Sequence, residues 1–577
     1  MVWFISNDNN LKSNKNHLFI TNIDKLFIKI NDLSIYIDGY IIPRTYIYKY
    51  YKDKPIEYTI YSLYNDYGTD FIHHLKGSFI LILFIKNKYY IYNDRHSLKK
   101  YFIYQNGKNV FISNSLKLIS EKYNLNIDKE NIAVFTLVSH FIDGCTLFKN
   151  VSYCRPAEVI EFDPLQLNRY YYWKPSNIFE QKKNYISNYI DYAQKWKQII
   201  SNYISYFEPE DITLTLTGGN DSRMVLSALL AINKNFHTFT YGNPNSYDGS
   251  IAREIRKNLN LVNKIYFESN ISEEWFRKNA LTIISYGNSL INIHRAHRND
   301  AIIKEVYNNK NTDMIFTGLV GGEYLKEPKY DNITIPIIFN KINNSKNKIK
   351  VCKLLKNMLL EKGVRTKEID IIIVYEKLMN ILKHGNKFTK LKRKFIYTYL
   401  YYGCSHHTQD SNVFGNYVRY VINPFMDIDY LEMIADYDKW YINNKPLLFS
   451  KIFHSNLLVQ ITNDLAPELS KIPYAKRGKY TANDLLNRKY KYLIKRLLYF
   501  INKDRDKYPQ NFPMGIWLYN FCSKELFEFS RDLLGIYDID FLKMKLNQIK
   551  SSASEESWHI ITNPININMN YEYFKCS

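Results

Sequence analysis

Hydrophobic and polar positions alternate with period two through the first 175 residues, in short runs separated by Asn, Asp and Gly. β-branched and aromatic side chains dominate these runs, and this composition and period are typical of half-buried strands. The pattern therefore predicts a mostly antiparallel sheet domain over residues 1–175, interrupted by a helix near Glu57–Tyr67. The runs lie at residues 2–5, 17–20, 34–37, 79–85, 89–92 and 109–112.

The pattern changes after residues 174–184, a polar stretch with Pro and Ser that we predict to be a linker. From Tyr185 onward, long segments of helical period alternate with short apolar runs, which favours a parallel α/β sheet. The second domain is thus expected to span residues 185–577, with a helical part beyond about residue 345. Its predicted strands are Ile212–Leu216, His237–Tyr241, Lys264–Phe267 and Asp313–Phe316.

The first of these strands runs into a turn suited to binding phosphate. Glycines permit positive φ and close backbone approach, and N–H groups at the start of the next helix attract an anion. A carboxylate in such a turn repels phosphate unless a cation lies between them, so Asp221 predicts Mg²⁺. The alternative is an ordinary turn between a strand and a helix. The predicted phosphate-binding residues are Thr217, Gly218, Gly219, Asn220, Asp221 and Ser222.

This turn resembles the S-G-G-x-D-S loop of the N-type ATP pyrophosphatases, which cleave ATP between its α and β phosphates. Thr217 replaces the first Ser and keeps its hydroxyl. No G-x-x-x-x-G-K-[ST] sequence occurs, so the kinase-like P-loop is excluded. Residues 75–118 and 146–173 are similar to the glutaminase domain of asparagine synthetases. The resemblance implies an α+β glutaminase-like domain followed by an α/β ATP pyrophosphatase domain.

The same resemblance assigns further residues to the ATP site. Tyr241 and Gly242 match the backbone that holds adenine, and Thr317 and Gly318 begin a segment similar to the second phosphate and metal motif. In that motif Gly322 replaces the family's metal-binding Asp, which leaves Glu323 as the second expected Mg²⁺ ligand beside Asp221. Asp248 lies at a helix start, where it is either a site residue or an N-cap.

Residues 465–480 resemble the Pro-rich turn that precedes the family's catalytic Lys. Spacing from Pro467 favours Lys476, with Lys479 as the alternate. A cation there would stabilise charge that develops on the α-phosphate and the leaving pyrophosphate. Arg295 is a third catalytic candidate, because it lies among His294, His297 and Arg298, which we predict to share one helical face.

The first domain lacks the residues that glutamine hydrolysis would require. Such glutaminases use an N-terminal Cys as nucleophile, whereas this sequence begins Met1-Val2-Trp3 and has no Cys before Cys145. The family's Asn-Gly-Glu turn matches only residues 38–40, and Ile56 stands where an Asp would pair with the substrate ammonium. We therefore expect a structural or docking role for this domain.

The predicted activity is ATP-dependent amide ligation without a glutaminase. A substrate carboxylate would attack the α-phosphorus to give an acyl-adenylate, and ammonia or an amine would then displace AMP. ATP and Mg²⁺ are the expected cofactors, and the acceptor could belong to a precursor peptide or a small molecule, as in lasso-peptide cyclases and β-lactam synthetases. Two alternative functions remain open, a tRNA-modifying ATP pyrophosphatase and a non-catalytic scaffold. The sequence decides neither whether the protein acts in asparagine biosynthesis nor whether it forms a homodimer.

Charge and cysteine content bear on the binding partners and the cellular compartment of the protein. The net charge of +22 invites a nucleic-acid reading, with candidate stretches at residues 391–395 and 476–496. However, Lys, Asn, Ile and Tyr are abundant throughout, as codon usage in an A/T-rich genome would produce. We therefore interpret the basic stretches as solvent-exposed faces in preference to binding sites for an anionic partner or a membrane surface. Six scattered cysteines indicate neither zinc nor disulfides. The longest apolar run, Phe79–Ile85, is too short to span a bilayer, and we expect a cytoplasmic protein.

Overall fold

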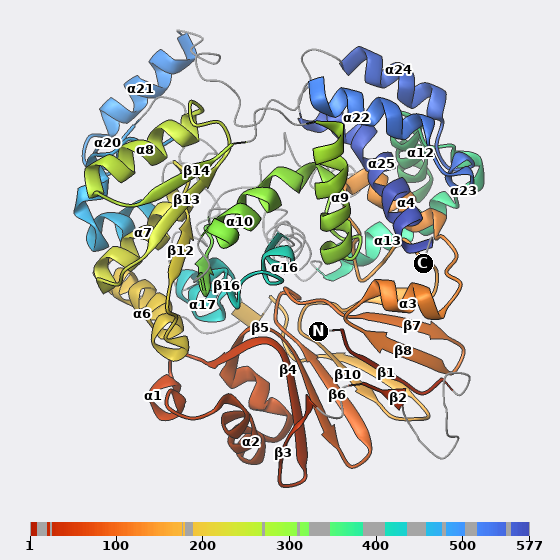
Figure 1. Cartoon of the computed structure of the whole chain (residues 1–577), viewed down its shortest axis with the longest axis horizontal. Helices are drawn as coiled ribbons and strands as arrows, with labels where there is room; N and C mark the ends of the chain where they lie inside the picture. Colours follow the sequence, from red (N-terminus) through yellow and green to blue (C-terminus); the bar gives the residue numbers. More distant parts are fainter. Residues whose placement is uncertain are drawn as a thin grey trace.

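Two antiparallel sheets pack face to face over residues 2–171 of the computed structural model, and we call this part the N-terminal sandwich (Figure 1). One sheet has the strand order β2-β1-β8-β7-β9, and the other has the order β11-β10-β6-β5-β4-β3. Alternate side chains such as Trp3, Ile82 and Ile112 fill the space between them. The strands are β1 Phe4–Ser6, β2 Ile20–Thr21, β3 Ile28–Ile30, β4 Leu33–Pro43, β5 Leu75–Ile85, β6 Lys88–Asn93, β7 Phe102–Asn106, β8 Asn109–Ser113, β9 Val151–Tyr153, β10 Glu158–Phe162 and β11 Leu167–Tyr171.

Helices cover the outer face of each sheet, which gives the sandwich four layers. The helices α2 (Ile56–Tyr67) and η3 (Gly68–His74) pack on the six-stranded sheet, and the short α1 (Tyr48–Tyr51) lies between β4 and α2 in the chain. The helices α3 (Leu116–Lys122) and α4 (Lys129–Val138) pack on the five-stranded sheet. The predicted antiparallel sheets and the helix near residues 57–67 are thus confirmed.

The structure describes a defined part of the chain. The described residues are 2–8, 20–22, 26–175, 177–178, 189–267, 272–308, 312–321, 347–384, 410–435, 457–475, 480–501, 516–549 and 555–575. Most of the predicted linker at 174–184 lies outside these ranges.

A five-stranded, fully parallel sheet forms the second part of the fold, in the order β14-β13-β12-β15-β16. Four strands agree with the prediction to within about a residue at either end. The fifth, β16, was not predicted, because it has three residues within a segment that reads as helical. The strands are β12 Ile212–Thr215, β13 His237–Tyr241, β14 Asn263–Tyr266, β15 Met314–Phe316 and β16 Tyr420–Ile422.

Helices cover both faces of this sheet, so its strands are apolar on both sides. Alternate strand residues such as Leu214 and Phe316 face one helical layer, whereas Phe239 and Ile315 face the other. The first layer consists of α6 (Tyr189–Phe207), α7 (Asn220–Ile232), α8 (Tyr247–Leu259) and α17 (Ile428–Ala435). The second contains α9 (Glu273–Gly287), η4 (Ile293–Arg295) and α10 (Ala296–Asn308).

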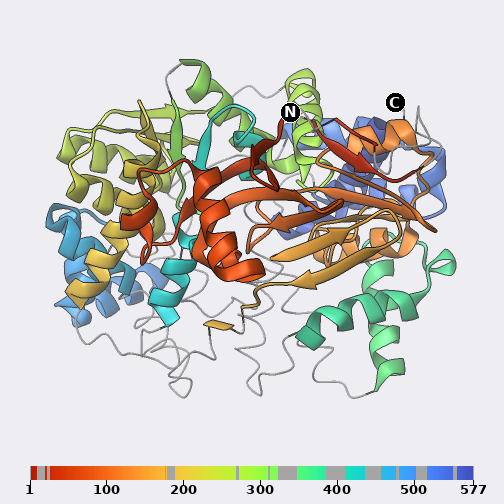
Figure 2. The same ribbon diagram turned by 90° about the horizontal axis from the view of Figure 1, so that it is seen from below.

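The remaining described segments are helical, as predicted for the part beyond residue 345. Several of these helices pack together against α4 and α9, and Figure 2 shows the N-terminal sandwich in front of the C-terminal helices of this group, with the helices of residues 348–384 below it. They are α12 Lys348–Leu360, η5 Thr366–Glu368, α13 Ile371–His384, α16 Asp410–Phe414, η7 Pro424–Met426, η8 Pro467–Lys471, α20 Ala482–Leu486, α21 Lys489–Ile501, α22 Ile516–Phe527, α23 Arg531–Leu534, α24 Ile539–Ile549 and α25 Glu555–Lys575.

Candidate functional site

The strand order of the parallel sheet creates one position where a ligand would bind. The chain leaves the central strand β12 toward β13 and β14 on one side, and later returns to add β15 and β16 on the other. In open α/β sheets, the crevice at the carboxyl ends of the strands opens where the order reverses in this way. The loops that follow β12 and β15 are residues 217–219 and 317–321, the two segments predicted to bind nucleotide.

The second loop contacts the first turn of α7, the helix that the first loop leads into. A Cβ added to Gly318 would lie 2.8 Å from the backbone nitrogen of Ser222, and one added to Gly321 would lie 2.9 Å from the Cβ of Asp221. Both glycines are therefore required for the close approach. Val320 adopts a φ of 67°, a strained conformation for a β-branched residue and one that recurs at functional sites.

The first loop satisfies most of its own N–H groups. Thr217 N–H donates to Ser222 Oγ at 3.1 Å, and Gly219 N–H donates to Thr217 Oγ1 at 3.3 Å. Gly218 N–H donates to Asp248 Oδ1 at 3.0 Å. The N–H groups left for an anion are therefore those of the first turn of α7. Neither glycine of this loop has a positive φ, so the predicted use of that freedom is wrong; the small size of Gly218 is what the structure needs.

The start of α7 has the properties of an anion and cation site. Its N-cap is Gly219, which has no side chain to accept the first N–H groups, and the helix dipole favours negative charge there. Both amide atoms of the buried Asn220 and Oδ1 of Asp221 are buried without a hydrogen-bond partner in the described part of the chain. Unpaired buried polar atoms are costly and call for a ligand.

Asp221 and the start of α7 have the chemistry to hold Mg²⁺ together with phosphate. Among the described residues, no group of three or more His, Cys, Asp or Glu side chains is placed to hold a metal. Mg²⁺ commonly takes one or two carboxylates and completes its shell with water and substrate phosphates. Asp221 would supply one carboxylate. Gly322 and the second predicted ligand, Glu323, lie outside the described residues.

Asp248 proves to be a partner of the loop and not a helix cap. The N-cap of α8 is Ser246, whose Oγ accepts the N–H of Gly249 at 3.1 Å. Burial raises the pKa of the Asp248 carboxyl, while the Gly218 N–H and the nearby Arg223 oppose that rise. Asp248 therefore fixes the position of Gly218, which ties α8 to the loop.

A second segment is held against the loop by a residue that the sequence analysis did not single out. The Arg223 side chain is fully buried, donates to the carbonyl oxygens of Ile472 (2.9 Å) and Pro473, and stacks on the Tyr474 ring at 4.2 Å. Ala475 N–H then donates to Gly218 O at 2.8 Å. The sequence did contain one indication of this role, because Arg223 is a basic residue on the otherwise apolar face of α7.

Lys476 and Lys479, the predicted catalytic cations, lie outside the described residues. The structure nevertheless fixes the residue that precedes Lys476 in the sequence, because Ala475 is bonded to the loop. A Cβ on Gly218 would lie 2.2 Å from the Ala475 Cβ, so the two backbones are in direct contact.

The predicted adenine strand ends beside α10. Tyr241 is the last residue of β13, and Gly242, with a φ of 107°, donates its N–H to Tyr266 O at 2.8 Å. The guanidinium of Arg298 lies 5.9 Å from the centre of the Tyr241 ring. The carboxyl end of β13 therefore has a cationic side chain, Arg298 of α10, close to it.

Arg295 ends the short helix η4, and α10, which contains Arg298, follows it directly in the chain. The buried Arg295 Nη1 lies 3.4 Å from Asp410 Oδ2, and Arg298 Nη1 lies 3.5 Å from the same oxygen. Of the two arginines, Arg298 is the one that contacts the predicted adenine-binding residue Tyr241.

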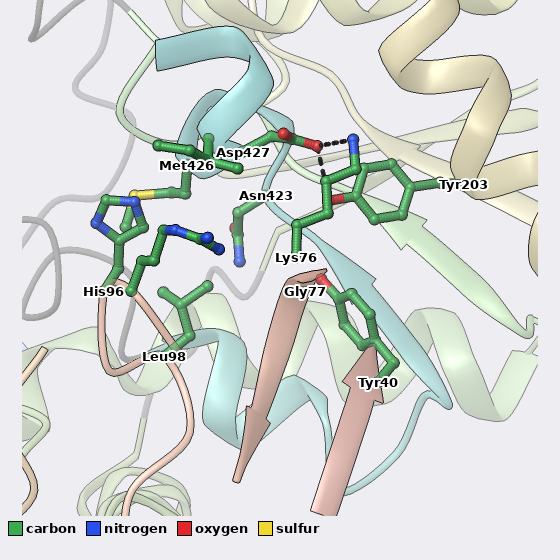
Figure 3. Close-up of a pocket in the computed structure, with 11 residues that line it drawn as sticks. Tyr40, Lys76, Gly77, His96, Leu98, Tyr203, Asn423, Met426 and Asp427 are labelled. Carbon is green, nitrogen blue, oxygen red and sulfur yellow. Dashed lines mark hydrogen bonds and ion pairs between the residues drawn. The ribbon is translucent and has the colours of Figure 1, made fainter. Parts of the chain in front are cut away.

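A pocket lies between the N-terminal sandwich and the segment that follows β16 (Figure 3). Lys76 of β5 pairs with Asp427 at 2.7 Å and with Asp429 at 2.8 Å. Although burial lowers the pKa of the Lys76 ammonium, the two carboxylates outweigh it and raise that pKa. Tyr203 OH also donates to Asp427 at 2.9 Å. The lining residues are Tyr40, Lys76, Gly77, Arg95, His96, Leu98, Tyr203, Asn423, Met426, Asp427 and Ile428.

This pocket has a direct connection to the nucleotide loops. Asn423 lines it, and the hydroxyl of Thr317 donates to Asn423 Oδ1 at 2.5 Å. Thr317 N–H donates in turn to Ile422 O at 3.0 Å. The second nucleotide loop and the wall of the pocket are therefore one continuous structure.

Trp3 follows Val2, the residue that the resemblance puts at the position of the nucleophilic Cys. Trp3 is fully buried, and its Nε1–H donates to Asp38 Oδ2 at 3.1 Å. Asn114 and Lys99 bind the same carboxylate at 3.0 and 3.2 Å. Burial raises the pKa of Asp38, but these partners outweigh it and the pKa is lowered overall. The acidic group is thus fully engaged by protein.

Comparison with known proteins leaves the family undetermined. No family model and no curated protein matches the chain. Among solved structures, it is similar over 41% of its length to the B. subtilis glutamine phosphoribosylpyrophosphate (PRPP) amidotransferase complexed with ADP and GMP, with 9% identity, 71% of that chain covered and a TM-score of 0.20. An allosteric regulatory enzyme of purine biosynthesis matches over 42%, with 8% identity, 62% of that chain covered and a TM-score of 0.19. At these scores the similarity carries no argument.

Proposed function

We propose that this protein is an ATP-dependent, AMP-forming amide ligase of the asparagine-synthetase type. The observation that carries the proposal is the contact between the second loop and the first turn of α7 at the strand-order reversal, where Asn220 and Asp221 present buried polar atoms without hydrogen-bond partners among the described residues. A nucleotide pyrophosphate with Mg²⁺ is the ligand whose charge and donor requirements match both residues and the start of α7.

Each part of the site has a separate task in this reaction. The first-turn N–H groups of α7 bind phosphate oxygens, Asp221 orients the Mg²⁺ that is bound with them, and Gly318 keeps the second loop close enough to share the ligand. When bound, Mg²⁺-ATP supplies an electrophilic α-phosphorus for a substrate carboxylate. Lys476 or Lys479, which follow Ala475 in the sequence, would stabilise the charge that develops on the leaving pyrophosphate.

The nitrogen nucleophile is ammonia or a substrate amine, and not glutamine. The N-terminal sandwich has Trp3 packed against Asp38, and no thiol is present among its first residues. Release of glutamate from glutamine by the purified protein would contradict this assignment. An amine within the same substrate would make the enzyme a cyclase.

Binding of inorganic pyrophosphate tests the site without knowledge of the carboxylate substrate. Calorimetric titration with Mg²⁺-pyrophosphate and with Mg²⁺-ATP should give saturable binding to the unmodified protein, weakened roughly 10-fold or more in Asp221→Asn, since a metal-bridged contact is lost. Asp66→Asn, an exposed change on α2, is the matched control and should bind normally. Absence of binding to the unmodified protein would sink the proposal and favour a non-catalytic scaffold.

The ligase step is tested by ATP–pyrophosphate exchange. A carboxylate that supports exchange, with L-aspartate the first to be assayed, identifies the substrate to be activated. Exchange that depends on added tRNA, with no carboxylate, would instead favour the tRNA-modifying alternative.

A further inference from the structure

One helix of the protein presents a row of apolar side chains to solvent. The exposed fractions in α21 are 61% for Tyr490, 51% for Leu493, 51% for Ile494, 61% for Leu497 and 49% for Leu498. Their spacing of i, i+3, i+4, i+7 and i+8 puts them on a single face. Isolated exposed leucines are normal, but a contiguous apolar face marks an interaction surface. We call these five residues the apolar row.

The opposite face of α21 is the one that holds it to the protein. Tyr492 is only 7% exposed, and its ring meets that of Tyr480 edge-on at 4.7 Å. Lys495 Nζ lies 2.7 Å from Asp484 Oδ2 in α20. In Figure 1, α21 lies at the outer edge of the molecule, on the side away from the N-terminal sandwich. The apolar row is therefore not part of the core that Tyr492 joins.

Basic residues flank the apolar row on both sides. From Arg488 to Ile501 the sequence contains five basic residues and no acidic one. At 3.6 residues per turn, positions 489 and 496 fall on one flank of the row and position 491 falls on the other, whereas Lys495 is paired with Asp484 and is not counted with them. Long basic side chains carry apolar stems with a charge at the tip, which suits them to the boundary between an apolar phase and an anionic layer.

We propose that α21 binds an anionic membrane surface. The apolar row would lie between the outermost parts of the lipid chains, and the flanking Lys and Arg residues would contact the negatively charged headgroups. Across the described residues, no helix is long and apolar enough to cross a membrane, so the helix would lie on the surface. Nucleic acid matches the basic flanks but offers no apolar phase for five exposed side chains, and a protein groove would not require flanks of a single sign.

Vesicle flotation of the full-length protein tests this inference. The protein should float with vesicles of equal parts phosphatidylcholine and phosphatidylglycerol, bind pure phosphatidylcholine vesicles at least 10-fold less, and lose most binding at 0.5 M salt, because salt screens the headgroup contacts. Leu493→Glu/Leu497→Glu should lower partitioning at least 10-fold. Both positions are half exposed, so the variant should unfold at the same temperature as the unmodified protein.

A matched double variant separates the surface from a general charge effect. Ile349→Glu/Leu360→Glu adds the same charge at two exposed apolar positions of α12, 79% and 47% exposed, and should bind vesicles normally. Failure of the unmodified protein to float, or equal binding by the α21 variant, would overturn the proposal. So would an α21-dependent RNA complex or dimer formed without vesicle binding. Flotation needs no nucleotide, so its outcome is independent of the proposed ligase activity.

Discussion

The backbone N–H of Ala475 donates a 2.8 Å hydrogen bond to the carbonyl oxygen of Gly218. This bond joins the segment that leads to Lys476 to the first glycine of the predicted nucleotide loop. Gly218 also differs from its neighbour Gly219 in how closely other atoms approach it.

Alanine at the two loop glycines should have unequal effects on stability. A Cβ at Gly218 would lie 2.2 Å from Ala475 Cβ, whereas a Cβ at Gly219 has Thr217 Oγ1, at 3.4 Å, as its nearest neighbour. We expect Gly218→Ala to lower the free energy of unfolding by about 1–3 kcal/mol through overpacking, and Gly219→Ala to cost less than about 1 kcal/mol. Urea denaturation measures both, and equal effects would contradict the close packing.

Arg223 should hold the segment before Lys476, which contains Ile472 and Pro473, in a fixed conformation. Arg223→Met removes two hydrogen bonds and leaves the carbonyl groups of Ile472 and Pro473 unpaired, with an expected cost of about 2–5 kcal/mol. Faster tryptic cleavage at Lys476, Arg477 or Lys479 should accompany it, as followed by mass spectrometry. Arg223→Lys should rescue little, since Lys lacks the planar fork of donors. Unchanged cleavage kinetics would argue against this role.

Lys76 should be essential for the contact between the N-terminal sandwich and the parallel-sheet region. Lys76→Met leaves the buried Asp427 without its cation, so we expect a loss of about 3–5 kcal/mol in unfolding free energy. Lys76→Met/Asp427→Asn should recover part of this loss, because the unpaired charge is then removed. Lys52→Met, at an exposed pair with an N–O distance of 4.0 Å, is the control and should change stability little.

His140 should make the protein sensitive to acid. Burial, assisted by Arg295, lowers the pKa of His140 to about 4 from the usual 6.5. Between these values the unfolded chain binds the proton and the folded chain does not, so stability falls as the pH decreases from 6.5 toward 4, by up to about 3 kcal/mol. His140→Gln, compared with the unmodified protein by urea denaturation at pH 7.5 and pH 5, should lose less stability on acidification. An identical loss would exclude His140 as the cause.

Lys476 should matter for turnover more than for nucleotide affinity. Once a substrate is identified, Lys476→Ala should reduce turnover by roughly 10²-fold with little change in ATP binding, as expected for an interaction made mainly in the transition state. Lys479→Ala should be milder. If Lys479→Ala reduced turnover more than Lys476→Ala, Lys479 would be the catalytic residue. If neither variant changed turnover, Arg298 would be the next candidate.

Local patterns predicted the two kinds of sheet and the positions of the two loops. Period-two runs overlap six of the eleven described sandwich strands, because each sheet has one face in the space around Trp3 and Ile82. The glycine pairs identify the loops because small residues are required where backbones touch. Strand β16 escaped prediction because three apolar residues have no distinguishable period.

The contacts that organise the site could not be read from local sequence. Both Ser246 and Asp248 are good caps for α8, and only the position of Gly218 decides that Asp248 is used elsewhere. Arg223 and its carbonyl partner Ile472 are 249 residues apart, and no spacing rule connects them. The pairing of Lys76 with Asp427, separated by 351 residues, depends likewise on the completed fold.

The large sequence separation of the residues in these contacts affects how the protein folds during its synthesis. The loop after β12 and the helix α7 leave the ribosome long before Ile472 and Ala475 are made, and long-range contacts form late because loop closure must precede them. A nascent chain that ends after β16 has all five parallel strands, yet Arg223 has no carbonyl partners and Gly218 O has no donor. The loop after β12 therefore acquires its final neighbours only near the end of translation, and under the proposed function a partly made chain should not hold ATP.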